Sequence, residues 1–284
     1  MSIPILDTHQ HLIYPGKYPY SWTDSLPPLK NTAFHIEDYL TLTKGSGITR
    51  TIFMEASPDD PHWLDETQFV YELSEQPNAI IEGVIANCRP ESPSGFEAYI
   101  ESVQHPKLVG FRRILHTMPD DLSQSDHFAT NIRLLAKYNL TFDLCFRADQ
   151  LPIARDLVQK CPNVQFILDH CGVPDIANSE TTPWRDHIAQ IAALPNVASK
   201  ISGVLAYCAE GNATTEAVRP YVEHCIASFG WNRVVWGSDW PVCNTRSDIQ
   251  TWVQISREIV ANADEADQEK LFHKNAERIY LKKS

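Results

Sequence analysis

Short apolar runs rich in β-branched and aromatic residues recur along the whole chain and predict a series of β-strands. Each run is bounded by turn-forming residues, and most hold too few charged residues for an exposed face. The predicted strands cover residues 5–11, 49–56, 79–87, 108–115, 140–146, 164–172, 197–204 and 233–241.

The segments between these runs carry apolar residues at helical spacing, which predicts amphipathic helices. Asp126 is the expected N-cap of one of them, because its carboxylate can accept hydrogen bonds from the first free N–H groups. The last segment is expected to cap the body of the fold or pack against it. The predicted helices cover residues 62–76, 126–138, 149–160, 183–194, 214–229, 247–262 and 266–281.

Strands that alternate with helices imply an α/β fold with a parallel sheet, and eight such units close naturally into a (β/α)8 TIM barrel. A barrel of this kind needs about 250 residues, and the chain has 284. Since no linker or low-complexity segment divides the sequence, residues 1–284 are expected to form a single domain. A doubly wound open sheet is the alternative, but the glycine-rich nucleotide loop that it would place after the first strand is missing.

Charge and composition narrow the partners and the compartment. The formal net charge is -12, which argues against nucleic acid or an anionic membrane surface as a partner. The N-terminus shows no secretory signal pattern, and no window is apolar enough for a membrane span. The seven cysteines are scattered without a C-x-x-C pair, which predicts reduced thiols. A soluble, cytoplasmic protein is expected.

Polar residues gather where three of the predicted strands end, and barrel enzymes place their active sites at these carboxyl ends. The first strand ends in His9 and His11, which alternation puts on the same side, as a pair that can bind a divalent metal or a water. The sixth ends in His170 and the eighth in Asp239. A lone His-x-His is more often structural, and Asp239 alone could cap a helix. Their convergence on one rim favours a functional site.

Several motifs resemble the amidohydrolase superfamily: D-T-H-Q-H, G-F-R-R, L-D-H-C-G, K-I-S-G, W-G-S-D-W-P and the tail F-H-K-N-A-E-R-I-Y. More narrowly, they resemble its amidohydrolase-related (family 2) lactonase group, which contains L-fuconolactonase, L-rhamnonolactonase and 2-pyrone-4,6-dicarboxylate lactonase. The resemblance covers essentially the whole chain. It implies that His9 and His11 form the family's His-x-His and that Asp239 is the general base. It also implies that His170 contacts the substrate carbonyl or orients water, and that Arg112 faces the pocket.

Departures from the superfamily pattern limit the metal site. Metal-dependent amidohydrolases typically have a histidine on the fifth strand and often a lysine or glutamate on the fourth. Here the fifth strand offers Asp143 and no histidine, and the fourth carries arginines. This leaves at most one divalent metal, with Zn²⁺ expected and His9, His11 and Asp239 as its ligands. Metal-independent catalysis stays open.

The resemblance implies a hydrolase of carbohydrate metabolism that opens a lactone ring, with a sugar-acid (aldono) lactone such as L-fucono- or L-rhamnonolactone as substrate. Asp239 would activate a water for attack on the carbonyl. His170, a cation of Arg112 or Lys200, or the metal would stabilise the oxyanion. The alternatives are a metal-dependent decarboxylase of aromatic acids on the same scaffold and a non-catalytic, decayed barrel. The expected partner is a small molecule, and a homodimer is compatible with such a barrel.

Other residues near the strand ends are weaker candidates for substrate binding. Glu55 could accept a bond from a sugar hydroxyl, ligate a metal or form a salt bridge, and Lys200 could bind substrate or neutralise a buried acid. The segment 12–35 carries Tyr20 and Trp22 and is expected to be a lid that stacks on sugar faces, with a packed Ω-like loop as the alternative. Trp184 could line the pocket or belong to the core.

Overall fold

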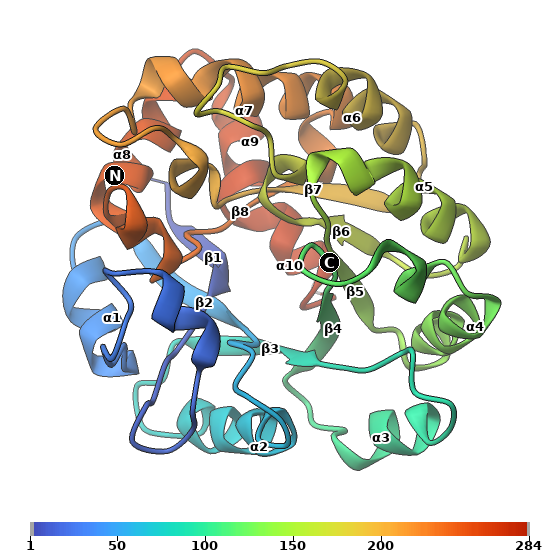
Figure 1. Cartoon of the computed structure of the whole chain (residues 1–284). Helices are drawn as coiled ribbons and strands as arrows, with labels where there is room; N and C mark the ends of the chain where they lie inside the picture. Colours follow the sequence, from blue (N-terminus) through green and yellow to red (C-terminus); the bar gives the residue numbers. More distant parts are fainter. Residues whose placement is uncertain (1–2, 283–284) are drawn as a thin grey trace.

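The computed structural model describes residues 3–282 and shows a (β/α)8 barrel (Figure 1). Eight parallel strands follow one another around the barrel in chain order, so all eight predicted strands are confirmed. They are β1 (Ile5–Gln10), β2 (Ile48–Met54), β3 (Ile81–Asn87), β4 (Leu108–Ile114), β5 (Thr141–Cys145), β6 (Phe166–Leu168), β7 (Val197–Ile201) and β8 (Val234–Trp236).

The barrel closes between the first and last strands at their carboxyl ends. The amide of Asp239 donates to the carbonyl of His9 at 2.7 Å, and the amide of His11 donates to the carbonyl of Trp240 at 2.8 Å. The pairing of β1 with β2 is irregular between Asp7 and Gln10. The closure therefore fixes the His-x-His segment directly against the segment that carries Asp239.

Helices surround the barrel, and the predicted helices are confirmed with ends that differ by a few residues. Ser125 caps α4 (Asp126–Leu134), since its hydroxyl accepts from the amide of Phe128, so the assignment of Asp126 as the N-cap was wrong by one residue. Two short helices, α1 and α3, were not predicted. The helices are α1 (Ile36–Thr43), α2 (Trp63–Ser74), α3 (Phe96–Ser102), α4 (Asp126–Leu134), α5 (Leu151–Lys160), α6 (Trp184–Ala192), α7 (Thr215–Phe229), α8 (Ile249–Ile259), α9 (Glu265–Glu269) and α10 (Asn275–Ile279).

The C-terminal segment closes the amino end of the barrel, and Figure 1 shows α10 inside the ring of strands. Ala276, Ile279 and Tyr280 pack against apolar side chains inside the barrel, among them Leu6 and Ile167. This agrees with the expectation that the last helix packs against the body of the fold. One end of the barrel is therefore filled with apolar groups, and polar groups gather at the other.

Strands β6 and β8 end earlier than predicted, at Leu168 and Trp236. The residues that follow leave the extended conformation, because His170 and Asp239 have positive φ angles of 55° and 58°. A strand cannot continue through left-handed backbone. The sequence pattern did not reveal these turns, since neither residue is a glycine.

All seven cysteines are free and buried. Within residues 3–282, the helices are too short or too polar to cross a membrane.

Candidate active site

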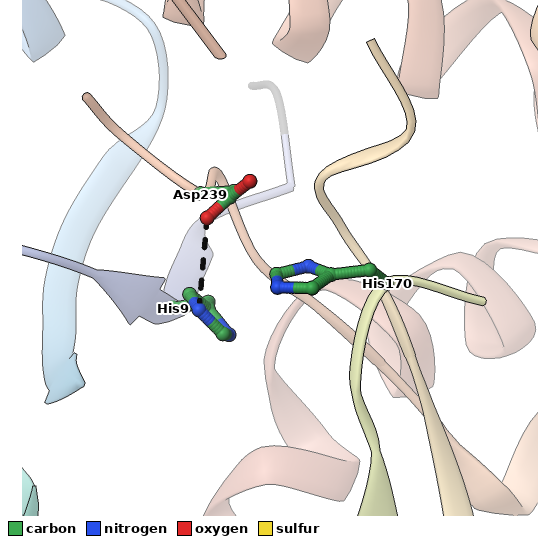
Figure 2. Close-up of side chains that lie close together, drawn as sticks. All are labelled: His9, His170 and Asp239. Carbon is green, nitrogen blue, oxygen red and sulfur yellow. Dashed lines mark ion pairs between the residues drawn. The ribbon is translucent and has the colours of Figure 1, made fainter. Parts of the chain in front are cut away.

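Four side chains meet at the carboxyl end of the barrel, and Figure 2 shows three of them pointing toward a common space. One oxygen of Asp239 lies 3.6 Å from Nε2 of His9 and 3.5 Å from Nε2 of His11. The ring of His170 lies 4.5 Å from that of His9, measured between centroids. The structure therefore brings together the two histidines of β1, His170 and Asp239, as the sequence predicts.

The inward direction of His170 depends on the backbone turn after β6. Along this strand Ile167 points into the barrel, so alternation directs Asp169 inward and His170 outward. The left-handed conformation of His170 brings its ring back to the site, where Nδ1 lies 2.9 Å from the hydroxyl of Ser202. Gly203 leaves the room for this ring, because a Cβ atom there would lie 2.7 Å from Cγ of His170.

His11 is held as one tautomer by backbone carbonyls. Its Nδ1 lies 3.0 Å from the carbonyl oxygens of Met54 and Glu55, which only accept hydrogen bonds. Nδ1 therefore carries the proton, and the Nε2 lone pair faces the carboxylate of Asp239. Burial lowers the pKa of His11 to about 4, and the charge of Arg112 adds to this shift. The Nε2 lone pair of His11 and the Asp239 carboxylate both accept hydrogen bonds, so a proton, a water or a cation has to lie between or beside them.

Asp239 is placed to exchange protons near neutral pH. Its side chain is almost fully buried, and burial raises its pKa to about 6, against the opposing effects of His170 and Arg112. Burial also lowers the pKa of His170, so this imidazole is neutral at pH 7. A carboxylate with such a pKa, surrounded by neutral imidazoles, has the properties of a general base.

Arg112 of β4 reaches the centre of the cluster and is fixed there by Glu55. Its Nε donates to the Glu55 carboxylate at 2.6 Å, and Nη2 donates to the Glu55 carbonyl at 2.8 Å. The remaining nitrogen, Nη1, lies 3.2 Å from Nε2 of His9. The fork geometry of the guanidinium thus leaves one end directed at the site.

Both carboxylate oxygens of Glu55 accept hydrogen bonds from other groups of the protein, and the ion pair with Arg112 agrees with its salt-bridge alternative. Besides Arg112, its carboxylate accepts hydrogen bonds from the side chain of Asn87 at 2.8 Å and the amide of Ser57 at 2.9 Å. The side chain is completely buried. A contact of Glu55 with a sugar hydroxyl or a metal stays a prediction.

Lys200 lies inside the barrel rather than at the rim. It is fully buried, and its Nζ lies 2.5 Å from Asp143 and 3.1 Å from Asp169. His9 covers it, with Nδ1 at 3.3 Å from Nζ. These ion pairs agree with the alternative role of Lys200, the neutralisation of buried acids, and its contact with substrate stays a prediction.

Of the aromatic candidates, Trp184 belongs to the core. Its indole N–H donates to the carbonyl of Cys171 at 2.8 Å, and its ring packs against Tyr221. This agrees with the core alternative for Trp184, and its place in the pocket wall stays a prediction. Tyr20 is buried within the 12–35 segment, while Trp22 donates from its indole N–H to the carbonyl of Ala56 at 2.9 Å. This bond fastens the segment to the carboxyl end of β2, on the side of the site.

A divalent cation fits the centre of the site. His9, His170 and Asp239 offer ligand atoms that lie within 4.8 Å of one another, whereas the sequence analysis expected His9, His11 and Asp239. The buried ionisable groups around them are acidic in excess, with five carboxyl groups against two cations: Asp7, Glu55, Asp143, Asp169 and Asp239 against Arg112 and Lys200. Nitrogen and oxygen donors together with surplus negative charge are what Zn²⁺ accepts.

Sequence reasoning missed Asp169 and the groups beside the site at the end of β5 and in the loops after β4 and β7. Asp169 contacts His9, Lys200 and Arg112 through its two oxygens, at 3.4, 3.1 and 3.7 Å. The inward position of Asp169 follows from the alternation of side chains along β6 from Ile167, but the adjacent histidine was the more obvious candidate.

His116 and Tyr207 also lie beside the site. Nδ1 of His116 lies 3.0 Å from the sulfur of Cys145, and the ring of Tyr207 lies 6.3 Å from that of His170.

The fold is a (β/α)8 barrel, and its candidate site is a cluster of three histidines and one aspartate at the carboxyl ends of the strands. The sequence profile of the amidohydrolase family matches residues 6–282, and the chain belongs to this family.

Individual relatives agree with this membership. An uncharacterised protein of Sinorhizobium fredii is 26% identical over 98% of this chain and 99% of its own length. An L-fucono-1,5-lactonase of Burkholderia ambifaria is 25% identical over 84% of this chain and 80% of its own. The crystal structure of a Burkholderia multivorans amidohydrolase with bound zinc superposes with a TM-score of 0.88 at 23% identity, covering 98% of this chain and 99% of that one. At 23% identity, the match to this crystal structure supports the fold alone.

Proposed function

We propose that this protein hydrolyses a sugar-acid lactone. The observation that carries the proposal is the buried carboxylate of Asp239, which lies 3.5–3.6 Å from two imidazole nitrogens and has its pKa raised by burial to about 6. The similarity to a protein named L-fucono-1,5-lactonase supports an aldonolactone as the substrate class. The aromatic 12–35 segment, fastened beside the site, supports a ligand with sugar faces.

The chain's own residues account for each step of the hydrolysis. Asp239 takes a proton from a water near His9 and His11, and the oxygen of this water attacks the ring carbonyl. His170 and the Nη1 group of Arg112, which is directed at the site beside His9, stabilise the oxyanion that develops. When the tetrahedral intermediate collapses, the ring C–O bond breaks, and Asp239 returns its proton to the departing oxygen, which yields the open hydroxy acid.

A metal would add to this chemistry without replacing it. His9, His170 and Asp239 would hold a zinc ion, which supplies Lewis-acid polarisation and lowers the pKa of a bound water.

The test is proton release from a panel of 1,5- and 1,4-aldonolactones, including L-fucono- and L-rhamnonolactone, followed with a pH indicator. Asp239→Asn should lower kcat about 10²–10⁴-fold, because the amide cannot take a proton. Asp126→Asn, an exposed aspartate with 96% of its side chain accessible, is the matched control and should keep wild-type turnover. Carbon dioxide release from aromatic acids without lactone opening would instead support the decarboxylase alternative.

A further inference from the structure

One extra residue is inserted in β1 where this strand approaches the candidate active site. Asp7 pairs with Thr51 of β2, and the next pair joins Gln10 to Phe53, so β1 advances three residues while β2 advances two. Such a β-bulge reverses the alternation of the side chains that follow it, and bulges are frequent at barrel rims and beside active sites. This bulge falls within the segment that carries His9.

The bulge directs His9 into the barrel. Leu6 packs among the apolar side chains inside the barrel, whereas Asp7 faces outward, where the hydroxyl of Tyr39 on α1 donates to its Oδ2 at 2.6 Å. Unbroken alternation would therefore turn His9 outward as well. Instead, Nδ1 of His9 lies 3.3 Å from Nζ of Lys200, inside the barrel.

Asp7 supplies hydrogen bonds where the regular strand pairing is interrupted. Its Oδ1 accepts from the backbone amides of His9 at 3.0 Å and of Ser238 at 2.8 Å. The first amide lies in the bulge, and the second follows the end of β8 at Trp236. Asp7 is completely buried, and buried amides are costly without an acceptor. One oxygen atom thus joins the strand that carries His9 to the turn that carries Asp239.

Ser238 adds a second connection between the same two segments. Its hydroxyl accepts from the amide of Trp240 at 3.0 Å and donates to the carbonyl of His9 at 3.2 Å. The amide of Asp239 donates to the same carbonyl at 2.7 Å. All three amides of the turn 238–240 are therefore fixed, two of them by side-chain oxygens. These bonds hold the left-handed conformation of Asp239, with a φ of 58°, against β1.

We propose that Asp7 is a positioning residue, which holds the bulge that points His9 inward and sets Asp239 against the imidazoles. Ser238 shares this role, and neither side chain has to touch the substrate. His9 and Asp239 each owe their direction to an unusual backbone conformation, so loss of the acceptor at Asp7 should let both move. A displacement of about 1 Å can lower a rate about 100-fold. Only the kinetic readout of this inference rests on the proposed lactonase function.

The test compares Asp7→Ala with Asp7→Asn. Asp7→Ala removes the acceptor, and we expect kcat for lactone opening to fall about 10–100-fold with KM changed by less than about threefold. Asp7→Asn should keep kcat within about threefold of the wild type, because an amide oxygen still accepts both N–H groups, although more weakly than a carboxylate. Equal losses of kcat in the two variants would overturn the proposal.

Tyr39→Phe separates positioning from stability. It removes the partner of the other carboxylate oxygen of Asp7 and leaves both amide bonds of Oδ1 in place. We expect a lower Tm but a kcat within about twofold of the wild type, since a buried hydrogen bond away from the reacting groups contributes to stability alone. A kcat loss as large as that of Asp7→Ala would mean that Asp7 only anchors α1, and would contradict the inference.

Crystal structures of Asp7→Ala and Asp7→Asn test the inference without a substrate. In Asp7→Ala the Asp239 oxygen should lose its contacts of 3.6 and 3.5 Å with His9 and His11, whereas Asp7→Asn should keep them. An unchanged site in Asp7→Ala would refute the inference. A wild type that opens no lactone, together with a displaced site in Asp7→Ala, would refute the proposed function and leave this inference standing.

Ser238→Ala keeps the proposal testable if Asp7→Ala does not fold. It removes the hydroxyl that links Trp240 to His9, and we expect kcat to fall about threefold to tenfold with unchanged KM, the loss that corresponds to one hydrogen bond. Ser199→Ala is the matched control, because it removes a fully buried serine hydroxyl of the adjacent β7 that has no hydrogen-bond partner among residues 3–282. Equal kcat values for these two serine variants would argue against the inference.

Discussion

At the scale of single residues, the site depends on backbone conformations that residues in β-strands do not adopt. His170 and Asp239 adopt left-handed conformations, which cost about 1–2 kcal/mol each for residues other than glycine. The surrounding barrel offsets this cost, and in return both side chains turn toward His9. Such strain at a polar cluster is typical of functional sites.

Gly203→Ala tests how closely His170 is fitted. A Cβ atom at this position would lie 2.7 Å from Cγ of His170 and 3.0 Å from Oδ2 of Asp239, so the imidazole must move. We expect kcat for lactone opening to fall at least tenfold, about 1.4 kcal/mol in activation free energy. Gly211→Ala is the control, because Gly211 has a similar φ of +71° with nothing within 4 Å of the added atom. Comparable losses of kcat in both variants would show that backbone strain alone is responsible.

The raised pKa of Asp239 predicts an acidic limb in the pH–rate profile. Burial disfavours the charged carboxylate and raises its pKa to about 6, and only the ionised form can act as the base. In protein freed of metal, kcat/KM should therefore be constant above this pH and fall tenfold per unit below it. A profile that is flat down to pH 4.5 would exclude Asp239 as the base.

At the scale of elements, the 12–35 segment is fastened over one side of the barrel mouth. Its ends pair through Ile13 and Phe34, and Ser21 donates to the carboxylate of Asp59 in the loop after β2. With the indole bond of Trp22, these contacts give a long loop a defined position above the strand ends. A fastened loop suits substrate binding better than proton transfer.

Trp22→Phe should therefore change KM more than kcat. The substitution keeps a ring but removes the hydrogen bond to the Ala56 carbonyl, which is worth about 0.5–1.5 kcal/mol. We expect KM for the lactone to rise about threefold to tenfold, with kcat within twofold. Trp231→Phe, which alters a half-buried tryptophan before β8 at the amino end of the barrel, serves as the comparison. A fall in kcat without a change in KM would assign the loop to catalysis instead.

At the scale of the whole molecule, the barrel separates stability from chemistry. Apolar side chains and the C-terminal helix fill its amino end, whereas His9, His11, His170 and Asp239 gather at its carboxyl end. The fold therefore does not need a metal, although the site can gain from one.

Metal removal should accordingly leave a folded protein. After chelation we expect unchanged far-UV circular dichroism, and zinc added back at 100 times its Kd should stabilise the protein by about 2.7 kcal/mol, seen as a rise in Tm. Asp239→Asn should show little of this rise, because it removes one ligand of the His9, His170 and Asp239 set. Unfolding on chelation, or an equal rise in the variant, would argue against zinc at this centre.

The sequence by itself determined the barrel and most of its polar mouth. Apolar periodicity, turn residues and chain length depend on local chemistry, and they were sufficient to predict all eight strands and the convergence of His9, His11, His170 and Asp239. Only the tertiary structure decided what surrounds them. Lys200 and Glu55 are fully buried beside opposite charges, and the conformation of His170 sets its direction. These properties depend on distances between strands far apart in the chain, which no local pattern records.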